Sequence, residues 1–262
     1  MDRLFRASRI FRTGLAFGTF GLGACVLTLL IVPIVRWRSR SRADTDLRVQ
    51  VVVHRSFGAF VRWMERLKLI VVEFEGEQPG GSEPVVVVAN HPTLIDFVLI
   101  ASVVPRCECI VKESLWSNRF LGGSVRAIGY IRNSEGPLLL KLCRESLGED
   151  GVLVVFPEGT RRKSAQPLKL TRGAAQIAVR NHYDLRLVHV SCDPPTLAKG
   201  EKWYHIPPRR PLFTVRVGER ICVNSYIDSS PSASVAARRL TADLSTALFP
   251  SAIQPLRKAG HS

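Results

Sequence analysis

A histidine and an aspartate stand five residues apart, directly after a run of four valines, in the segment VVVVANHPTLIDFVLI (residues 85–100). A neutral imidazole can take a proton from a hydroxyl group, and a carboxylate bonded to its other nitrogen fixes the tautomer and stabilises the imidazolium that forms. His91 and Asp96 are therefore candidates for a dyad that activates an alcohol. On one ideal helix they would lie about 140° apart, since each residue turns ~100°. They meet only if His91 lies in the turn before the helix, and Pro92 favours this because the residue before a proline prefers extended backbone.

The same residues have two simpler interpretations. Thr93 and Asp96 have the Thr-x-x-acid spacing of a capping box, in which the acid serves only the start of the helix. A histidine in a loop can also be merely solvated. Catalysis, capping and solvation therefore remain alternatives when these residues are considered alone.

A second polar turn, FPEGTRRK (residues 156–163), follows the apolar run GVLVVF (residues 151–156). Glu158 can accept hydrogen bonds from substrate hydroxyls or orient Arg161, whose planar fork can grip a phosphate. Gly159 allows a tight turn and a close approach of a ligand to backbone amides. A polar turn with a local ion pair is the simpler alternative. A larger basic set, suited to a phosphorylated head group or coenzyme A, comprises Arg161, Arg162, Lys163, Lys169 and Arg172.

Strands and helices that alternate along the chain must position both turns. Continuous apolar runs predict the strands, and helical periodicity with proline and serine signals predicts the helices between them. The predicted strands are residues 69–76, 84–89, 107–113, 127–133, 151–156, 185–192 and 211–223, the last of them near a sheet edge. The predicted helices are residues 51–69, 93–104, 114–126, 137–147, 171–180 and 229–248, the last with Ser230 as its N-cap and Pro231 at its first position.

This alternation is typical of an α/β fold with a mainly parallel central sheet and helices on both faces. In such folds, ligands gather beyond the carboxyl ends of the strands. Both polar turns follow strands, so we expect them to lie at the same edge of the sheet and to form one site.

An uncharged stretch of 22 residues, residues 14–35, lies between two groups of arginines. As a helix it would reach about 33 Å at ~1.5 Å per residue, enough for a bilayer core of ~30 Å. A secretory signal is the alternative, but its apolar region is normally only ~7–15 residues, and the flank here is RWRSRSR. Arginines on both sides leave a full span and a monotopic, dipping helix pair as alternatives. We expect residues 1–68 to form arginine-flanked membrane-anchoring helices that precede an α/β domain of residues 69–262.

Charge and cysteine usage narrow the class of protein. The formal net charge of +15 indicates an anionic partner, and residues 1–42 carry about half of it, which favours a membrane surface over nucleic acid. The six cysteines include no C-x-x-C pair, which favours free thiols in a reducing compartment over a zinc site. An aromatic rim at the membrane interface is a further hypothesis, with ordinary packing as its alternative. Its residues would be Trp116, Arg119, Phe120, Trp203, Arg209 and Arg210.

Both polar turns resemble known motifs. NHPTLID (residues 90–96) resembles the HxxxxD motif of the glycerolipid acyltransferases, the family that includes lysophosphatidate acyltransferase, and FPEGTR (residues 156–161) resembles that family's third motif. The resemblance covers roughly residues 72–192, with the two motifs in the expected order. It implies an acyltransferase in which His91 is the general base and Asp96 orients it. It also implies that the acyl acceptor is bound by Glu158, Gly159 and Arg161.

The resemblance implies partners as well. The acyl donor would be a thioester on coenzyme A or acyl carrier protein, with no permanently bound cofactor and no metal ion. The acceptor would be a lysophospholipid such as 1-acylglycerol-3-phosphate, presented among membrane lipids. The location would be the inner, cytoplasmic membrane of a bacterium, with the active site on the cytoplasmic face. A thioester hydrolase and a non-catalytic membrane module that binds anionic lipid are the alternatives.

Two motifs depart from the family pattern. The second motif usually ends in arginine, whereas GYIRN (residues 129–133) has Asn133 at that position and Arg132 one place early. His189 stands where the fourth motif normally has a proline. Both differences concern the acceptor head group. Residues 193–219 resemble members found in bacterial aryl-polyene pigment gene clusters, which implies an unusual acyl group or acceptor.

Overall fold

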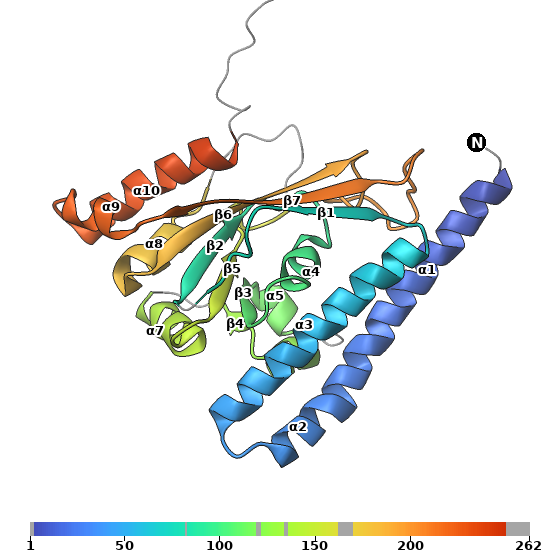
Figure 1. The fold of residues 1–262 in the computed structure, drawn as a ribbon, viewed down its shortest axis with the longest axis horizontal. Coiled ribbons are helices and arrows are strands. Elements are labelled where there is room, and N and C mark those ends of the chain that lie inside the picture. The colour runs from blue at the N-terminus through green and yellow to red at the C-terminus, as the bar shows by residue number, and fades with distance from the viewer. Residues whose placement is uncertain (1–2, 82, 119–121, 134–135, 162–169, 250–262) are drawn as a thin grey trace, which may run out of the picture.

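A seven-stranded sheet forms the centre of the protein in a computed structural model that describes residues 3–81, 83–118, 122–133, 136–161 and 170–249 (Figure 1). The strands are β1 (Val71–Glu75), β2 (Val85–Ala89), β3 (Cys107–Val111), β4 (Ile131–Arg132), β5 (Val152–Val155), β6 (Asp184–Asp193) and β7 (Leu212–Ile221). Their order in the sheet is β1-β7-β6-β2-β5-β3-β4. Neighbours pair in parallel except β6 and β7, which are antiparallel. The prediction of a mainly parallel α/β sheet is therefore confirmed, and β7 lies one strand in from the β1 edge.

Helices cover both faces of this sheet. The described helices are α1 (Arg3–Val26), a π-helical turn η1 (Leu27–Ile31), α2 (Val32–Arg38), α3 (Arg42–Arg66), α4 (Asp96–Ala101), α5 (Glu113–Trp116), α6 (Gly122–Ile128), α7 (Pro137–Leu147), α8 (Gly173–Asn181), α9 (Asn224–Asp228) and α10 (Ala233–Leu248). Residues of α3, α4 and α6 belong to one buried cluster, and residues of α7, α8 and α10 belong to the other.

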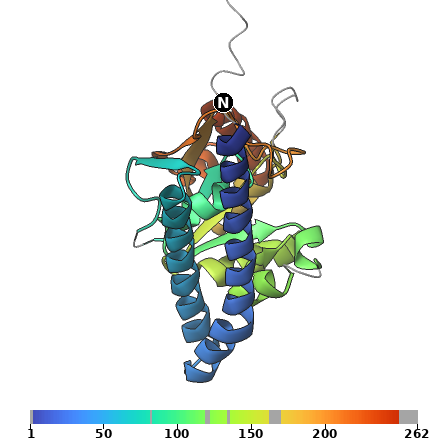
Figure 2. The same ribbon diagram turned by 90° about the vertical axis from the view of Figure 1, so that its right-hand side faces the viewer.

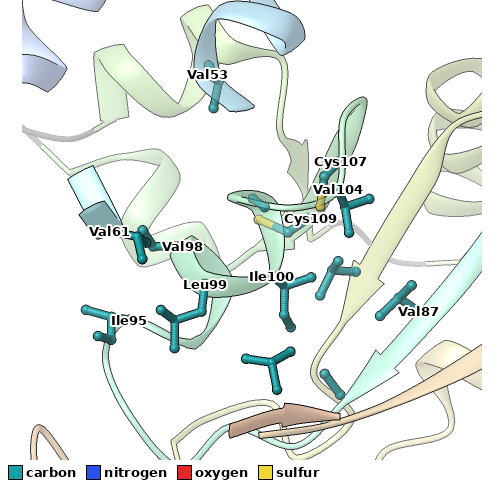
Figure 3. Close-up of a cluster of buried hydrophobic side chains, with 14 of the residues drawn as sticks. Val53, Val61, Val87, Ile95, Val98, Leu99, Ile100, Val104, Cys107 and Cys109 are labelled. Carbon is teal, nitrogen blue, oxygen red and sulfur yellow. The ribbon is translucent and has the colours of Figure 1, made fainter. Parts of the chain in front are cut away.

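The central strand β2 supplies side chains to both clusters, because successive residues of a strand point to opposite faces. Val85 and Val87 belong to the cluster with α3 and α4, whereas Val86 and Val88 belong to the cluster with α8 and α10. In Figure 3, Leu99 of α4 lies between Val61 of α3 and Val87 of β2. The strand that carries the dyad turn is thus buried on both faces, which fixes the position of its carboxyl end.

The N-terminal helices form a long hairpin beside the sheet. α1, η1 and α2 follow one another as a continuous helical rod, and α3 runs back beside it (Figure 2). Phe20 of α1 contacts Phe60 of α3, with their ring centroids 5.1 Å apart. Within the described residues, Arg6–Arg38 is long and apolar enough to cross a membrane, and only 17% of its most apolar window is buried. A core helix would be mostly buried, so this exposure fits the expected membrane-anchoring segment.

Several predicted boundaries were wrong. α3 begins at Arg42, well before the predicted residue 51, because Ser41 caps it by accepting a hydrogen bond from Asp44 N at 3.1 Å. α10 is capped by Ser232, not Ser230, so Pro231 lies outside the helix.

Three other predicted elements are shorter than expected. The helix predicted over residues 114–126 is two helices, α5 and α6. α6 extends to Ile128, which leaves only two residues of the predicted strand 127–133 in β4. The helix predicted from residue 93 begins at Asp96, because Thr93 takes part in the turn before it.

Candidate active site

The two polar turns meet at the carboxyl ends of β2 and β5, which are parallel neighbours in the sheet. The backbone N–H of His91 donates a hydrogen bond to Glu158 Oε1 at 2.8 Å. The ring of His91 also stacks on Phe156, the first residue after β5, with centroids 4.3 Å apart. The turns therefore form one site, as their positions after two strands predicted.

Asn90 fixes the point at which the chain leaves the sheet. Its side-chain amide donates to Val190 O at 2.7 Å and accepts from Val190 N at 2.6 Å. The Asn90 side chain thus bonds to the backbone N–H and C=O of Val190, which a continuing β2 backbone would otherwise bond. The chain can therefore leave the sheet at His91. This role of Asn90 was not predicted from the sequence, although an asparagine directly after a buried strand is a signal for it.

His91 and Asp96 are in direct contact, with Nδ1 and Oδ2 2.7 Å apart. Asp96 is completely buried, whereas the side chain of His91 is 20% exposed. An ionised carboxylate can only accept, so Nδ1 carries the proton in this pair and Nε2 of the neutral ring keeps its lone pair. The exposed part of the ring is consistent with access for a hydroxyl.

Asp96 also accepts two hydrogen bonds from Thr93, one from its backbone N–H at 2.7 Å and one from its hydroxyl at 2.5 Å. The capping interpretation of the Thr-x-x-Asp spacing therefore holds together with the dyad, and the two are not alternatives. Because Oδ2 receives both the imidazole and the Thr93 N–H, the turn before α4 orients the carboxylate towards His91.

The second turn is shaped by Gly159, whose φ of +64° lies in the left-handed region that favours glycine. Its N–H donates to Phe156 O at 2.9 Å. Thr171 closes the other side, since its N–H and its hydroxyl both donate to Pro157 O, at 2.8 and 2.9 Å. These bonds tighten the turn that carries Glu158.

Arg161 is held by the backbone that follows β6. Its Nη1 donates to Leu197 O at 3.2 Å and to Ala198 O at 3.4 Å. A guanidinium has five N–H donors, so these bonds fix its position while other donors remain for an anionic group. Of the larger basic set, Arg172 is exposed, and Arg162, Lys163 and Lys169 lie outside the described residues.

The residues that depart from the family motifs are engaged elsewhere. Arg132 pairs with Glu113, and the N–H of Asn133 donates to Val111 O at 2.9 Å. His189 lies on β6, where partial burial and then the neighbouring Arg216 lower its pKa. None of these three residues hydrogen-bonds to the side chain of His91 or Asp96. Of the predicted aromatic rim, Trp203 is exposed and Trp116 is half-buried, and Arg119 and Phe120 lie outside the described residues.

No cysteine in the described part of the chain hydrogen-bonds to the side chain of His91. None of the six is disulfide-bonded. Burial raises the pKa of Cys192 to about 12, as it does for Cys143, so both are protonated thiols at neutral pH. Among the described residues, no group of His, Cys, Asp and Glu is placed to hold a metal ion.

The part of the chain that carries both turns is similar to known proteins. Residues 71–193, which include both turns, match the family model described as Acyltransferase. These residues belong to the acyltransferase family. A 1-acyl-sn-glycerol-3-phosphate acyltransferase of Helicobacter pylori is 35% identical over 99 residues, or 35% of this chain and 42% of that protein. The alpha form of that enzyme in Mus musculus is 25% identical over 191 residues, or 70% of this chain and 64% of that protein.

The chain spans about 42% to 64% of the length of these curated relatives. Its fold is similar over nearly the full length to the crystal structure of the 1-acyl-sn-glycerophosphate acyltransferase PlsC from Thermotoga maritima. The TM-score is 0.69 and the sequence identity 18%, with 97% of this chain and 99% of that chain covered. The likeness shows that the N-terminal helices and the sheet form one shared fold.

Proposed function

We propose that the protein transfers an acyl group from a thioester to the hydroxyl of a lysophospholipid. The contact between His91 Nδ1 and Asp96 Oδ2, at a sheet edge shared with Glu158, is the observation that carries this proposal. Family membership of residues 71–193 supports it, because the relatives are named as acyltransferases that act on 1-acyl-sn-glycerol-3-phosphate.

In the proposed mechanism, His91 Nε2 takes the proton of the acceptor hydroxyl as its oxygen attacks the thioester carbonyl. A carbon–oxygen bond forms, the carbon–sulfur bond breaks, and the proton passes from the imidazolium to the leaving sulfur as a thiol. Asp96 stabilises the imidazolium between these two proton transfers. A thioester is already activated, so no covalent enzyme intermediate is needed.

Acceptor binding is assigned to the second turn. Arg161 offers guanidinium N–H groups to the phosphate, and Gly159 lets the phosphate approach the backbone. Glu158 already accepts from the backbone of His91, so its proposed role is to join the acceptor site to the dyad. The donor is acyl-coenzyme A or acyl carrier protein, and the acceptor is 1-acylglycerol-3-phosphate or a related lysolipid. The departures at Asn133 and His189 leave a different lipid acceptor as a variant of the proposal. The resemblance of residues 193–219 leaves an aryl-polyene acyl group as another variant.

Attachment to the cytoplasmic face of the inner membrane is part of the same proposal. The Arg6–Arg38 helix is apolar and mostly unburied, and it is flanked by arginines that can contact anionic head groups. Both substrates of the proposed reaction carry apolar chains, so a membrane-bound enzyme would meet its acceptor where that acceptor resides.

The experiment that tests this function combines the purified protein with labelled acyl-coenzyme A or acyl carrier protein and a panel of lysolipids, with products identified by mass spectrometry. The expected product is a diacylated lipid that forms with the wild-type protein and not with the His91→Ala variant. Free fatty acid released equally with and without an acceptor would instead identify a hydrolase. Salt-sensitive vesicle binding without any acyl turnover would identify a binding module.

A further inference from the structure

The loop between β6 and β7, residues 194–211, contacts the candidate active site at one end. Leu197 O accepts hydrogen bonds from Leu94 N at 3.1 Å and from Arg161 Nη1 at 3.2 Å. Leu94 belongs to the turn that carries the dyad. The backbone of this loop therefore holds both polar turns, and the position of Arg161 depends directly on it.

The same loop is fastened to α1 further along. The indole of Trp203 lies against Gly14, where an added Cβ would be 3.5 Å from the ring, and its centroid is 6.1 Å from that of Phe17. Arg9 is almost completely buried and donates to Pro207 O at 2.7 Å. Figures 1 and 2 both show the orange end of the sheet beside the blue α1. The loop is thus a physical link between the apolar N-terminal helix and Arg161.

The tip of this loop, residues 202–205, has the composition of a membrane interface. All four residues are exposed, with Trp203 at 44% and Tyr204 at 39%. Lys202 Nζ lies 5.5 Å from the centroid of the Tyr204 ring. Tryptophan and tyrosine combine an apolar ring with a polar group, and they are enriched at the level of lipid head groups next to basic residues.

The position of the tip on α1 indicates what covers it. Gly14, against which Trp203 packs, lies at the start of the uncharged stretch 14–35, two residues after Arg12. The tip therefore lies at the boundary between the charged and the apolar parts of the helix. Exposed apolar side chains continue from there along α1, with Leu15 at 41% and Leu22 at 65%. The continuity of this apolar surface and the positive charge of Lys202 favour an anionic lipid surface as the partner that covers the tip.

We propose that the β6–β7 loop is a membrane-seated strap that couples contact with anionic lipid to the orientation of Arg161. Lys202, Trp203 and Tyr204 rest in the lipid interface, and this support fixes the loop backbone whose Leu197 carbonyl holds Arg161. The inference rests on the proposed function, in which Arg161 binds the acceptor. Trp203 and Tyr204 are positioning residues in this scheme, because they act through the loop.

Lipid contact is tested without any enzymatic assay. The chain has four tryptophans, so the Trp37→Phe, Trp63→Phe, Trp116→Phe variant reports from Trp203 alone. Vesicles of phosphatidylethanolamine and phosphatidylglycerol with brominated acyl chains should quench and blue-shift its fluorescence. Vesicle binding, measured by sedimentation, without quenching of Trp203 would overturn the proposal.

Coupling is tested with a water-soluble, short-chain lysophosphatidate as the acceptor. Vesicles that contain no acceptor should raise the wild-type kcat/KM for this soluble acceptor about three- to tenfold. The Trp203→Ser/Tyr204→Ser variant should show no such activation. Its activity without vesicles should stay within about twofold of the wild-type activity without vesicles. Equal activation of both proteins, or an equal loss of activity with and without vesicles, would overturn the coupling.

A matched control is Phe74→Ser on β1, because Phe74 is 43% exposed, much as Trp203 is. It lies between Glu73 and Glu75, whose charges disfavour an anionic surface. Phe74→Ser should keep the full activation by vesicles. If the wild-type protein transfers no acyl group to any acceptor, the proposed function fails and the coupling fails with it, whereas the quenching of Trp203 still decides the lipid contact.

Discussion

Asp96 and Glu108 are both buried carboxylates, with exposed fractions of 0% and 7%, but their surroundings differ. Asp96 accepts hydrogen bonds from His91 Nδ1 and from the N–H and hydroxyl of Thr93. Glu108, on β3, accepts through Oε1 from Gln50 of α3. Its Oε2 is buried without a hydrogen-bond partner in the described part of the chain.

The difference shows that burial alone does not make a carboxylate useful for catalysis. Burial raises the pKa of Glu108 to about 8, with a further contribution from Asp46 that Gln50 and Arg106 only partly oppose. Glu108 therefore holds a proton at neutral pH. Asp96, by contrast, has a hydrogen-bond donor at each of its two oxygens.

The largest expected effect distinguishes the two carboxylates directly. Asp96→Asn should lower kcat for acyl transfer by about 10²–10⁴-fold, because an amide can present N–H to His91 Nδ1 and so stabilise the wrong tautomer. Glu108→Gln makes the same chemical change at the other buried carboxylate and should leave kcat within about twofold. Steady-state kinetics on both variants make the comparison. Similar losses in the two proteins would mean that Asp96 is structural.

The second prediction concerns the dependence of stability on pH. From about pH 4.3, the unfolded pKa of glutamate, up to about pH 8, the folded protein holds a proton on Glu108 that the unfolded chain has released. The free energy of unfolding should therefore fall as the pH rises through this range. Glu108→Gln should remove that slope, so the free energy of unfolding of the variant should gain about 4 kcal/mol relative to that of the wild type between about pH 5 and pH 8. Urea unfolding between pH 5 and 8 provides the measurement, and parallel slopes for the two proteins would contradict it.

The smallest expected effect concerns one of the donors to Asp96. Thr93→Val removes the hydroxyl and keeps the backbone N–H, so kcat should fall by about tenfold. Thr93→Ser retains the hydroxyl and should stay within about twofold of the wild-type value. A loss of the same size in the serine variant would show that the threonine methyl group, and not its hydrogen bond, is required.

Much of the fold could be predicted because the strands and helices carry strong local patterns. β2 and β5 are continuous valine-rich runs, and α7 begins at a proline, so their positions agree with the prediction to within about one residue. Boundaries failed where a side chain decided them, as Ser41 does for α3 and Ser232 for α10. Several serines near a helix start have equal local signals, and only the folded backbone selects among them.

The candidate site was predictable in its residue types but not in its contacts. The spacing of His91 and Asp96 indicated that the two side chains could meet, and the structure places them in hydrogen-bond contact. The sequence could not show that Glu158 accepts from the His91 backbone, because that bond joins residues 67 positions apart. The link from Arg161 to Leu197 also depends on tertiary packing.

The most direct test of the account measures acyl transfer by the His91→Ala variant with and without added imidazole. If His91 Nε2 is the general base, kcat should fall by about 10²–10⁴-fold while acceptor binding changes little. Because the His91 ring is 20% exposed, imidazole should reach the vacated position and restore part of the turnover, whereas the weaker base pyrazole should not. Near wild-type turnover in the His91→Ala protein without imidazole would contradict the account.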